Sequence, residues 1–362
     1  ELQQAKATRS LKALQTIQRE WQRVQADERT SEAITLAVQT ITLAEPVDRL
    51  TAFLRAVDPN QPQALNLQQL KQLATVLPQQ GLQNAKSDFA QEMQQLSQGL
   101  SAGLQAWQRL EAHLVSWIYN QQAQLGFAGV PEQRGPWALW ASQVRSSLPQ
   151  ALFQTLALNH SLSEAAARQS GVELRTWVEL VVVLQCLQRG LVAWFDKMVY
   201  DAKVGARLSI STFLVFSSIW SQLGSGFSQN ATLSHSSRAQ FAQGCFQITQ
   251  QILRNFVQRE YFPLYGGIFA SFSGNYLRDT LNYLDEPLRQ VSGTQEKARI
   301  LTLLGYSLRA QGLLPQALAY HQQALEIARQ AEDVRCEIAS LNHLSRTYVA
   351  QKNYAEAINN SQ

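Results

Sequence analysis

The chain has 362 residues, of which 45% are apolar and 16% are charged, and its formal net charge at pH 7 is +4. A chain of this length holds about two or three domains, each with its own hydrophobic core. The 31 Lys and Arg residues are dispersed among 27 Asp and Glu residues, which argues against nucleic acid as a partner. Glycine and proline number only 18 and 10 and fall in clusters, which favours an all-α fold of long helices with short breaks.

The cysteines bear on the compartment in which the protein works. Cys186, Cys245 and Cys336 lie far apart, mostly in apolar settings. An odd and scattered set argues against a disulfide framework and indicates a reducing compartment. We therefore expect a cytoplasmic protein, with peripheral association with a membrane as the alternative.

The first region, about residues 1–126, shows the periodicity of long amphipathic helices. Apolar residues three or four positions apart predict an opening helix, through Leu14, Ile17, Trp21 and Val24. Glu45-Pro46 predicts a helix stop, because proline disfavours helix in the residue before it. Shorter helices are expected around residues 47–57 and 66–77, and a long one over about 87–125.

The long helix carries an apolar seam with steps of three or four residues. Its members are Phe89, Met93, Leu96, Leu100, Leu104, Trp107, Leu110, Leu114 and Trp117. A cofactor-binding or membrane-facing surface has the same form. We interpret the stripe as a core seam that packs against a neighbouring helix.

The segment "GFAGVPEQRGPW" is the clearest linker in the chain, with three glycines and two prolines. A more apolar helical region covers about residues 131–270 and begins within this linker. Val181, Val182 and Val183 are β-branched and by themselves favour a strand. The apolar run around them is too long and too free of turn signals for a strand, so we expect a buried helix.

Residues 208–227, "LSISTFLVFSSIWSQLGSGF", contain no charge over a length that is enough to cross a bilayer. The segment also carries six serines, which suits close packing between helices better than contact with lipid. In a membrane hairpin over about 177–227, Glu179 and Arg189 would lie inside the first span at an energetic cost. We interpret both segments as core helices and keep membrane insertion as the alternative.

The third region, about residues 271–362, contains a repeat with a period of forty residues, as from 305 to 345. The segment "ILTLLGYSLRAQGLLPQALAYHQQAL" aligns with "SLNHLSRTYVAQKNYAEAINNSQ". The aligned pairs are Leu304 with Leu344, Gly305 with Ser345, Leu308 with Tyr348, Leu314 with Tyr354, and Ala317 with Ala357.

This pattern resembles the tetratricopeptide repeat over about residues 298–362, with small helix B residues at Ala317, Ala324 and Ala357. The resemblance implies stacked helix pairs, in which small residues let helix A and helix B approach closely. Gln362 falls inside helix B of the second repeat, so we expect further repeats after it. Residues 191–223 also resemble a segment of uncharacterised tetratricopeptide proteins of cyanobacteria, and this likeness implies no activity.

The resemblance further implies a binding groove lined by helix A. In the register above, its exposed positions are Arg299, Thr302, Tyr306 and Arg309, followed in the second repeat by Asn342, Arg346 and Val349. Three arginines without an acidic residue favour carboxylates, because a guanidinium binds a carboxylate through two parallel hydrogen bonds. We expect a protein or peptide partner with an acidic segment or C-terminus. The alternative is that these arginines are solvated or pair with acids of a neighbouring repeat.

The sequence shows no pattern typical of catalysis, and we expect no enzyme, no cofactor and no metal site. The histidines are isolated, without HExxH or CxxC spacing: His113, His160, His235, His321 and His343. "LGSGFS" lacks the lysine of a phosphate loop. The charged residues around Asp196 and Lys197 are interpreted as a solvated loop. The leading interpretation is a non-enzymatic scaffold with tetratricopeptide-type repeats, and the alternative is a membrane-associated adaptor.

Overall fold

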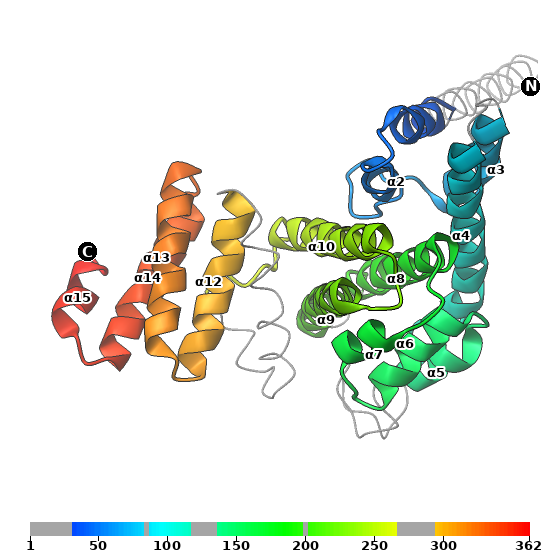
Figure 1. Cartoon of the computed structure of the whole chain (residues 1–362). Helices are drawn as coiled ribbons and strands as arrows, with labels where there is room; N and C mark the ends of the chain where they lie inside the picture. The colour runs from blue at the N-terminus through cyan, green and yellow to red at the C-terminus, as the bar shows by residue number, and fades with distance from the viewer. Residues whose placement is uncertain (1–30, 83–86, 117–135, 198–201, 266–293) are drawn as a thin grey trace, which may run out of the picture.

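The computed structural model describes residues 31–82, 87–116, 136–197, 202–265 and 294–362, and these residues form helices and no strand (Figure 1). The all-α prediction is therefore confirmed. The expected opening helix around Trp21 and nearly all of the linker after residue 126 lie outside the described residues.

The helices follow one another with short breaks. Residues 31–43 are helical, followed by α2 (Arg49–Ala56), α3 (Leu67–Leu82) and α4 (Ser87–Glu111). The central helices are α5 (Trp137–Gln143), α6 (Ser147–Ala157), α7 (Leu162–Arg168), α8 (Leu174–Phe195), α9 (Ala202–Gln229) and α10 (His235–Val257). The C-terminal helices are α12 (Gln295–Ala310), α13 (Leu314–Gln330), α14 (Val334–Ala350) and α15 (Tyr354–Asn359).

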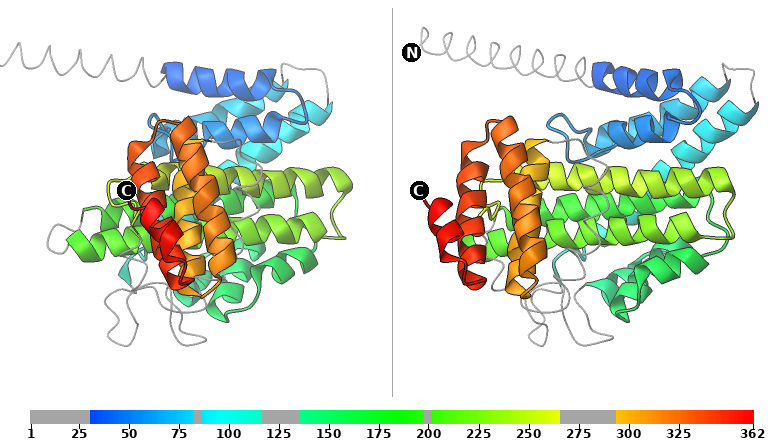
Figure 2. Two further views of the ribbon diagram at one scale, coloured as in Figure 1. Left: turned by 90° about the vertical axis from the view of Figure 1, so that its left-hand side faces the viewer. Right: turned by 60° about the vertical axis from the view of Figure 1, so that its left-hand side comes forward.

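Helices α8, α9 and α10 run side by side in the centre of the molecule (Figure 2). On one side α4 packs along α8, and α3 packs on α4. The short helices α6 and α7 contact α8 and α9. Helices α12 to α15 stand across one end of the central layer, where α12 contacts α10 (Figures 1 and 2). Buried apolar residues form one cluster that runs from Ala37 to Ala339.

The apolar seam of α4 lies in the core, as predicted. Its eight described members, from Phe89 to Leu114, are each at most 8% exposed. They pack between α3 and α8, the two helices that α4 contacts most. Trp117, the last predicted member, lies outside the described residues.

The predicted extension of this helix to residue 125 is wrong, because α4 ends at Glu111. His113 N donates to Leu110 O at 2.8 Å, which tightens the last turn. The indole Nε1 of Trp140 then donates to His113 O at 3.3 Å. The indole thus satisfies a carbonyl just beyond the end of the helix, and Leu114 stays buried although it lies outside α4.

Helices α8 and α9 are the two apolar segments that raised the membrane question. Leu174–Phe195 and Val204–Gln229 both pass a test of length and hydropathy for a membrane span, and their most apolar windows are 72% and 83% buried within the fold. Glu179, the acidic residue in α8, is itself buried and accepts a hydrogen bond from Ser146 Oγ. Both helices therefore pack as core helices of this fold, and Val181 to Val183 lie in α8 rather than in a strand.

The small residues of α9 allow close approach of its neighbours. Five of the six serines between residues 208 and 227 are buried. A Cβ at Gly224 would lie 3.2 Å from the Cβ of Cys245 on α10, and a Cβ at Gly226 would lie 2.4 Å from Ser163 O on α7. The serine-rich composition therefore serves helix packing, as the sequence indicated.

The Asp196 segment is more than a solvated loop. Asp196 Oδ1 accepts hydrogen bonds from Ser209 Oγ at 2.8 Å and from the Tyr261 hydroxyl at 3.1 Å. Its Oδ2 pairs with Arg259 Nη1 at 3.2 Å. The carboxylate thus joins the end of α8 to α9 and to the segment after α10.

The C-terminal helices repeat with the predicted period. Gly312 and Lys352, which are 40 positions apart, both have positive φ, at 79° and 62°. Gly312 N donates to Arg309 O at 3.0 Å, and Lys352 N donates to Val349 O at 2.9 Å. The turn between helix A and helix B therefore has the same backbone form in both repeats. The predicted small positions of helix B are also buried, at Ala317, Ala324 and Ala357.

The division into residues 1–126, 131–270 and 271–362 stays a prediction. Its boundaries fall mostly in residues 117–135 and 266–293, outside the described residues. Across the first boundary, α4 and α8 contribute to one buried cluster.

Candidate functional site

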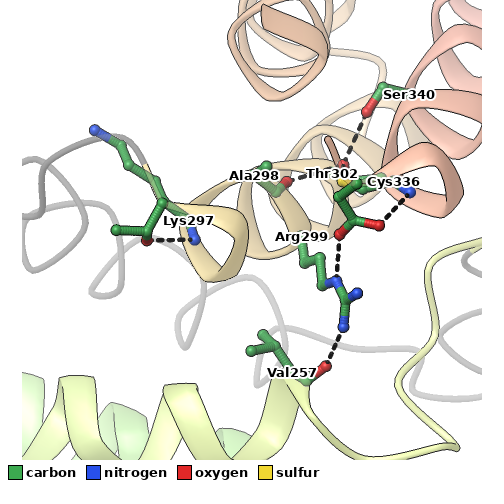
Figure 3. Close-up of polar contacts among 9 residues, drawn as sticks. Val257, Lys297, Ala298, Arg299, Thr302, Cys336 and Ser340 are labelled. Carbon is green, nitrogen blue, oxygen red and sulfur yellow. Dashed lines mark hydrogen bonds and ion pairs between the residues drawn. The ribbon is translucent and has the colours of Figure 1, made fainter. Parts of the chain in front are cut away.

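The predicted binding face of helix A begins with Arg299 on α12, and this residue is already engaged within the chain (Figure 3). Arg299 Nε pairs with Asp333 Oδ2 at 2.7 Å, and Arg299 Nη1 donates to Val257 O at 2.8 Å. Burial alone would raise the pKa of Asp333, but the hydrogen bond from Arg299 lowers the pKa below its usual value. Arg299 therefore ties the end of α10 and the start of α14 to α12. Its pair with Asp333 is the alternative that the sequence left open, in which an arginine pairs with an acid of a neighbouring repeat.

The prediction that Thr302 lines an open groove is wrong. Its side chain is 0% exposed. Thr302 Oγ1 donates to Ala298 O at 3.0 Å and lies 3.2 Å from Ser340 Oγ and 3.6 Å from Cys336 Sγ (Figure 3). The physical reason is the stacking of the repeats, since helix A of one repeat also packs against helix A of the next.

The C-terminal half of α12 keeps Tyr306 and Arg309 near the surface. Both side chains are partly buried, and the Arg309 guanidinium lies over the Tyr306 ring, 5.2 Å from its centroid. Burial lowers the pKa of Arg309, and the charge of Arg346 lowers it further. Arg309 Nη1 is buried and has no hydrogen-bond partner among the described residues.

The predicted positions on α14 are exposed. Asn342, Arg346 and Val349 follow one another along the surface of this helix. Among the described residues, neither Arg309 nor Arg346 has an acidic side chain within ion-pair distance. We name the residues that remain available on α12 and α14 the arginine surface: Tyr306, Arg309, Asn342, Arg346 and Val349.

Two histidines that look isolated in the sequence meet directly below the arginine surface. The rings of His321 on α13 and His343 on α14 stack with centroids 5.0 Å apart and planes 12° apart, and both side chains are fully buried. His343 Nε2 lies 2.8 Å from Leu264 O, and because a carbonyl only accepts, this nitrogen carries the proton. Tyr306 packs edge-on against His343 with centroids 5.7 Å apart.

Both histidines are neutral near pH 7. Burial, with the neighbouring His343 and Arg309 acting in the same direction, lowers the pKa of His321 to about 3. Burial also lowers the pKa of His343 to about 4, against the hydrogen bond to Leu264 O, which raises it. The positive charge of this part of the fold therefore resides on Arg309 and Arg346.

Sequence reasoning missed the histidine pair because its members are 22 positions apart and belong to different repeats. Gly305, the small residue of helix A, was the one signal in the sequence for the position of the His321 ring. A Cβ at this position would lie 2.5 Å from the His321 ring, so a small residue on α12 corresponds to a bulky ring on α13. In the part of the chain that the structure describes, no group of three or more His, Cys, Asp or Glu side chains is placed to hold a metal ion.

The arrangement suits recognition of an anion. The Arg346 guanidinium lies close enough to lower the pKa of Arg309, and the two stand beside an aromatic ring, an amide and an exposed valine. A carboxylate between the guanidiniums would accept charge-assisted hydrogen bonds and relieve their repulsion.

Comparison with known proteins covers only these repeats. No curated protein matches the chain, and no solved structure does. Residues 296–362, which contain nearly all of α12 and the whole of α13 to α15, match the family model of the tetratricopeptide repeat.

Proposed function

We propose that the protein is a non-enzymatic helical scaffold of the cytoplasm whose repeats bind an acidic segment or C-terminus of a partner protein. The tetratricopeptide match at residues 296–362 supports a role in protein–protein interaction. Stacked helical repeats present extended surfaces to partners, and here the first repeat helix, α12, packs on α10 of the central helices. The three cysteines are free thiols, which agrees with a reducing compartment.

The preference for an acidic partner rests on one observation, the pair Arg309 and Arg346. Arg299, the third predicted arginine, is already paired with Asp333 and has an internal role. Arg309 and Arg346 lack such a partner among the described residues, and Arg346 lowers the pKa of Arg309. A partner carboxylate stabilises two neighbouring guanidiniums through charge-assisted hydrogen bonds.

The test is capture of a partner from a cell lysate by the intact chain and by the Arg309→Glu/Arg346→Glu variant. Proteins retained by the wild type and lost from the variant are identified by mass spectrometry. The acidic segment of each is then synthesised and used as a competitor. We expect that segment alone to displace the captured protein. Capture that survives the double substitution would place the binding surface elsewhere, and the N-terminal helices are then the next candidate.

A matched control removes the same charge from the opposite end of the repeat helices. Arg329 and Arg335 lie near the turn between α13 and α14, and both are exposed. Arg335 is separated from Arg346 by 11 residues of α14, or about 16 Å along the axis. The Arg329→Glu/Arg335→Glu variant should capture the partner as the wild type does, because it changes the net charge equally but away from the arginine surface. It also breaks the ion pair of Arg329 Nε with Glu337 Oε1 at 2.8 Å, and loss of such a surface pair costs at most about 1 kcal/mol.

The alternative function is a membrane-associated adaptor, in which helices α8 and α9 insert and the repeats recruit a soluble partner. The observation behind it is the length and hydropathy of these helices. Their burial within the fold favours the scaffold. Sedimentation of detergent-free protein separates the two functions, because a scaffold gives one monodisperse species. Aggregation that only detergent relieves would favour insertion.

A further inference from the structure

A cavity of about 470 Å³ lies between the N-terminal helices and α8, away from the arginine surface. Its floor is apolar and buried, with Leu70, Leu100, Trp107 and Val182 on three different helices. Its rim is open to solvent, where Ala193 is exposed. Cavities of about 300–1,000 Å³ with apolar walls and a few polar groups are typical of sites for small organic molecules.

One face of α8 forms a wall of the cavity. The lining positions on this helix run from Val182 to Ala193, with successive steps of three residues and one residue in turn. They follow the helix axis for about 16 Å, since each residue of an α-helix advances about 1.5 Å. The cavity is therefore shaped for an extended apolar group rather than for a compact one.

Two side chains on the cavity face of α8 carry hydrogen-bond donors. Gln185 is 3% exposed, and its Nε2 has no hydrogen-bond partner among the described residues. Arg189, one helical turn further along, is exposed and has no ion pair with any described residue. Side chains at i and i+4 lie on the same helix face, so one acceptor group can reach both donors. Burial raises the pKa of Cys186 to about 12, so the thiol between them stays uncharged.

We propose that this cavity binds an amphiphilic carboxylate such as a medium-chain fatty acid, with its chain on the floor and its carboxylate at Gln185 and Arg189. Glu111 on α4 also lines the cavity and by itself would favour a cationic head group. Glu111 is exposed to water, whereas the Gln185 donor is buried and lacks an acceptor. A buried donor without a partner costs more than a hydrated carboxylate, and the cavity is therefore built for an acceptor. This site is independent of the repeats and of their proposed partner.

The test is isothermal titration calorimetry of the intact chain with dodecanoate and with dodecylamine, each below its micelle concentration. We expect dodecanoate to bind at one site, and dodecylamine, which is cationic at neutral pH, to bind roughly tenfold more weakly or not at all. Ala193→Trp should fill the rim of the cavity and weaken dodecanoate binding by roughly tenfold or more. Gln185→Leu should weaken dodecanoate binding by roughly tenfold, the loss of one hydrogen bond to a charged group. Arg189→Glu should weaken it by roughly tenfold or more, because it also places a negative charge beside the bound carboxylate.

A matched control is available on the same helix. Gln188 is 1% exposed and its Oε1 also lacks a partner, but Gln188 does not line the cavity. Gln188→Leu should therefore leave the affinity for dodecanoate unchanged. Three results would overturn the proposal: no binding of dodecanoate to the wild type, equal binding to Ala193→Trp, or equal affinity for dodecylamine. Because Ala193 and Arg189 are exposed, their variants test the site without a change in the core.

Discussion

Replacing Gly305 by alanine should destabilise the first repeat, because the new methyl group would overlap the His321 ring. A Cβ at position 305 would lie 2.5 Å from Cε1, 2.7 Å from Nδ1 and 2.8 Å from Nε2 of that ring. The ring has no room to retreat, since it is fully buried and stacks on His343. Overpacking of this kind costs roughly 1–3 kcal/mol. Alanine instead of glycine stabilises a helix by about 1 kcal/mol, so we expect a net loss of up to about 2 kcal/mol.

The assay is urea denaturation followed by circular dichroism, on the single variants and on Gly305→Ala/His321→Ala. Without the His321 ring, the same Gly305→Ala change should stabilise the helix by roughly 0.5–1 kcal/mol, so its effect reverses sign between the two backgrounds. Ser345, the aligned residue of the second repeat, already carries a Cβ, and its hydroxyl donates to Ala357 O at 2.9 Å. If Gly305→Ala stabilises both backgrounds equally, α12 and α13 do not approach at this residue and the repeat register is wrong.

Three further predictions concern stability. Ala317→Leu should overpack the contact between α12 and α13 and cost roughly 1–3 kcal/mol; unchanged thermal stability would contradict the register. Trp107→Ala should cost roughly 3–5 kcal/mol, because this ring lies buried in the α4 seam; a variant as stable as the wild type would mean that the seam faces solvent. The pKa values of His321 and His343 are lowered to about 3 and about 4, so stability is full above pH 6.5 and is lost as the pH falls toward these values. The loss of unfolding free energy should approach about 1.4 kcal/mol per pH unit for each ring, and denaturation midpoints between neutral and acidic pH would measure it. His321→Leu should remove the part of this pH dependence that His321 contributes. Midpoints that do not change with pH would refute the neutral buried pair.

The sequence was informative wherever a pattern is local. The seam from Phe89 to Leu114 repeats every three or four residues, and this period alone identifies the buried face of α4. The forty-residue period predicted the small helix B positions Ala317 and Ala357. The turns at Gly312 and Lys352 show the same period, because both residues have positive φ. The serines of α9 likewise indicated close helix packing before any neighbour was known.

The errors arose where a distant partner decides the outcome. Trp140 caps His113 O from 27 positions away, and no local signal places the end of α4 at Glu111. The repeat register leaves Thr302 on the face of helix A that lies opposite helix B, and so predicts it to be open. The next helix A, through Ser340, covers it instead.

Distant contacts also decide which of the predicted arginines are available to a partner. Arg299 meets Asp333 at the start of the following repeat and Val257 O at the end of α10, a contact between regions far apart in sequence. Arg309 and Arg346 have no such neighbour among the described residues, so the candidate surface is smaller than the sequence suggested. Which arginines remain available therefore depends on how the repeats dock on the central helices.

A titration with a defined acidic peptide shows whether Arg309 and Arg346 form a surface for carboxylates. Fluorescence anisotropy of a labelled oligoglutamate peptide with a free C-terminus would report binding to the intact chain, to Arg309→Glu/Arg346→Glu and to Arg329→Glu/Arg335→Glu. We predict that the first double variant binds at least roughly tenfold more weakly than the wild type, and that the second binds within about twofold of it. Equal weakening in both variants would show that only net charge matters, and unchanged affinity in the first would contradict the arginine surface as the binding site.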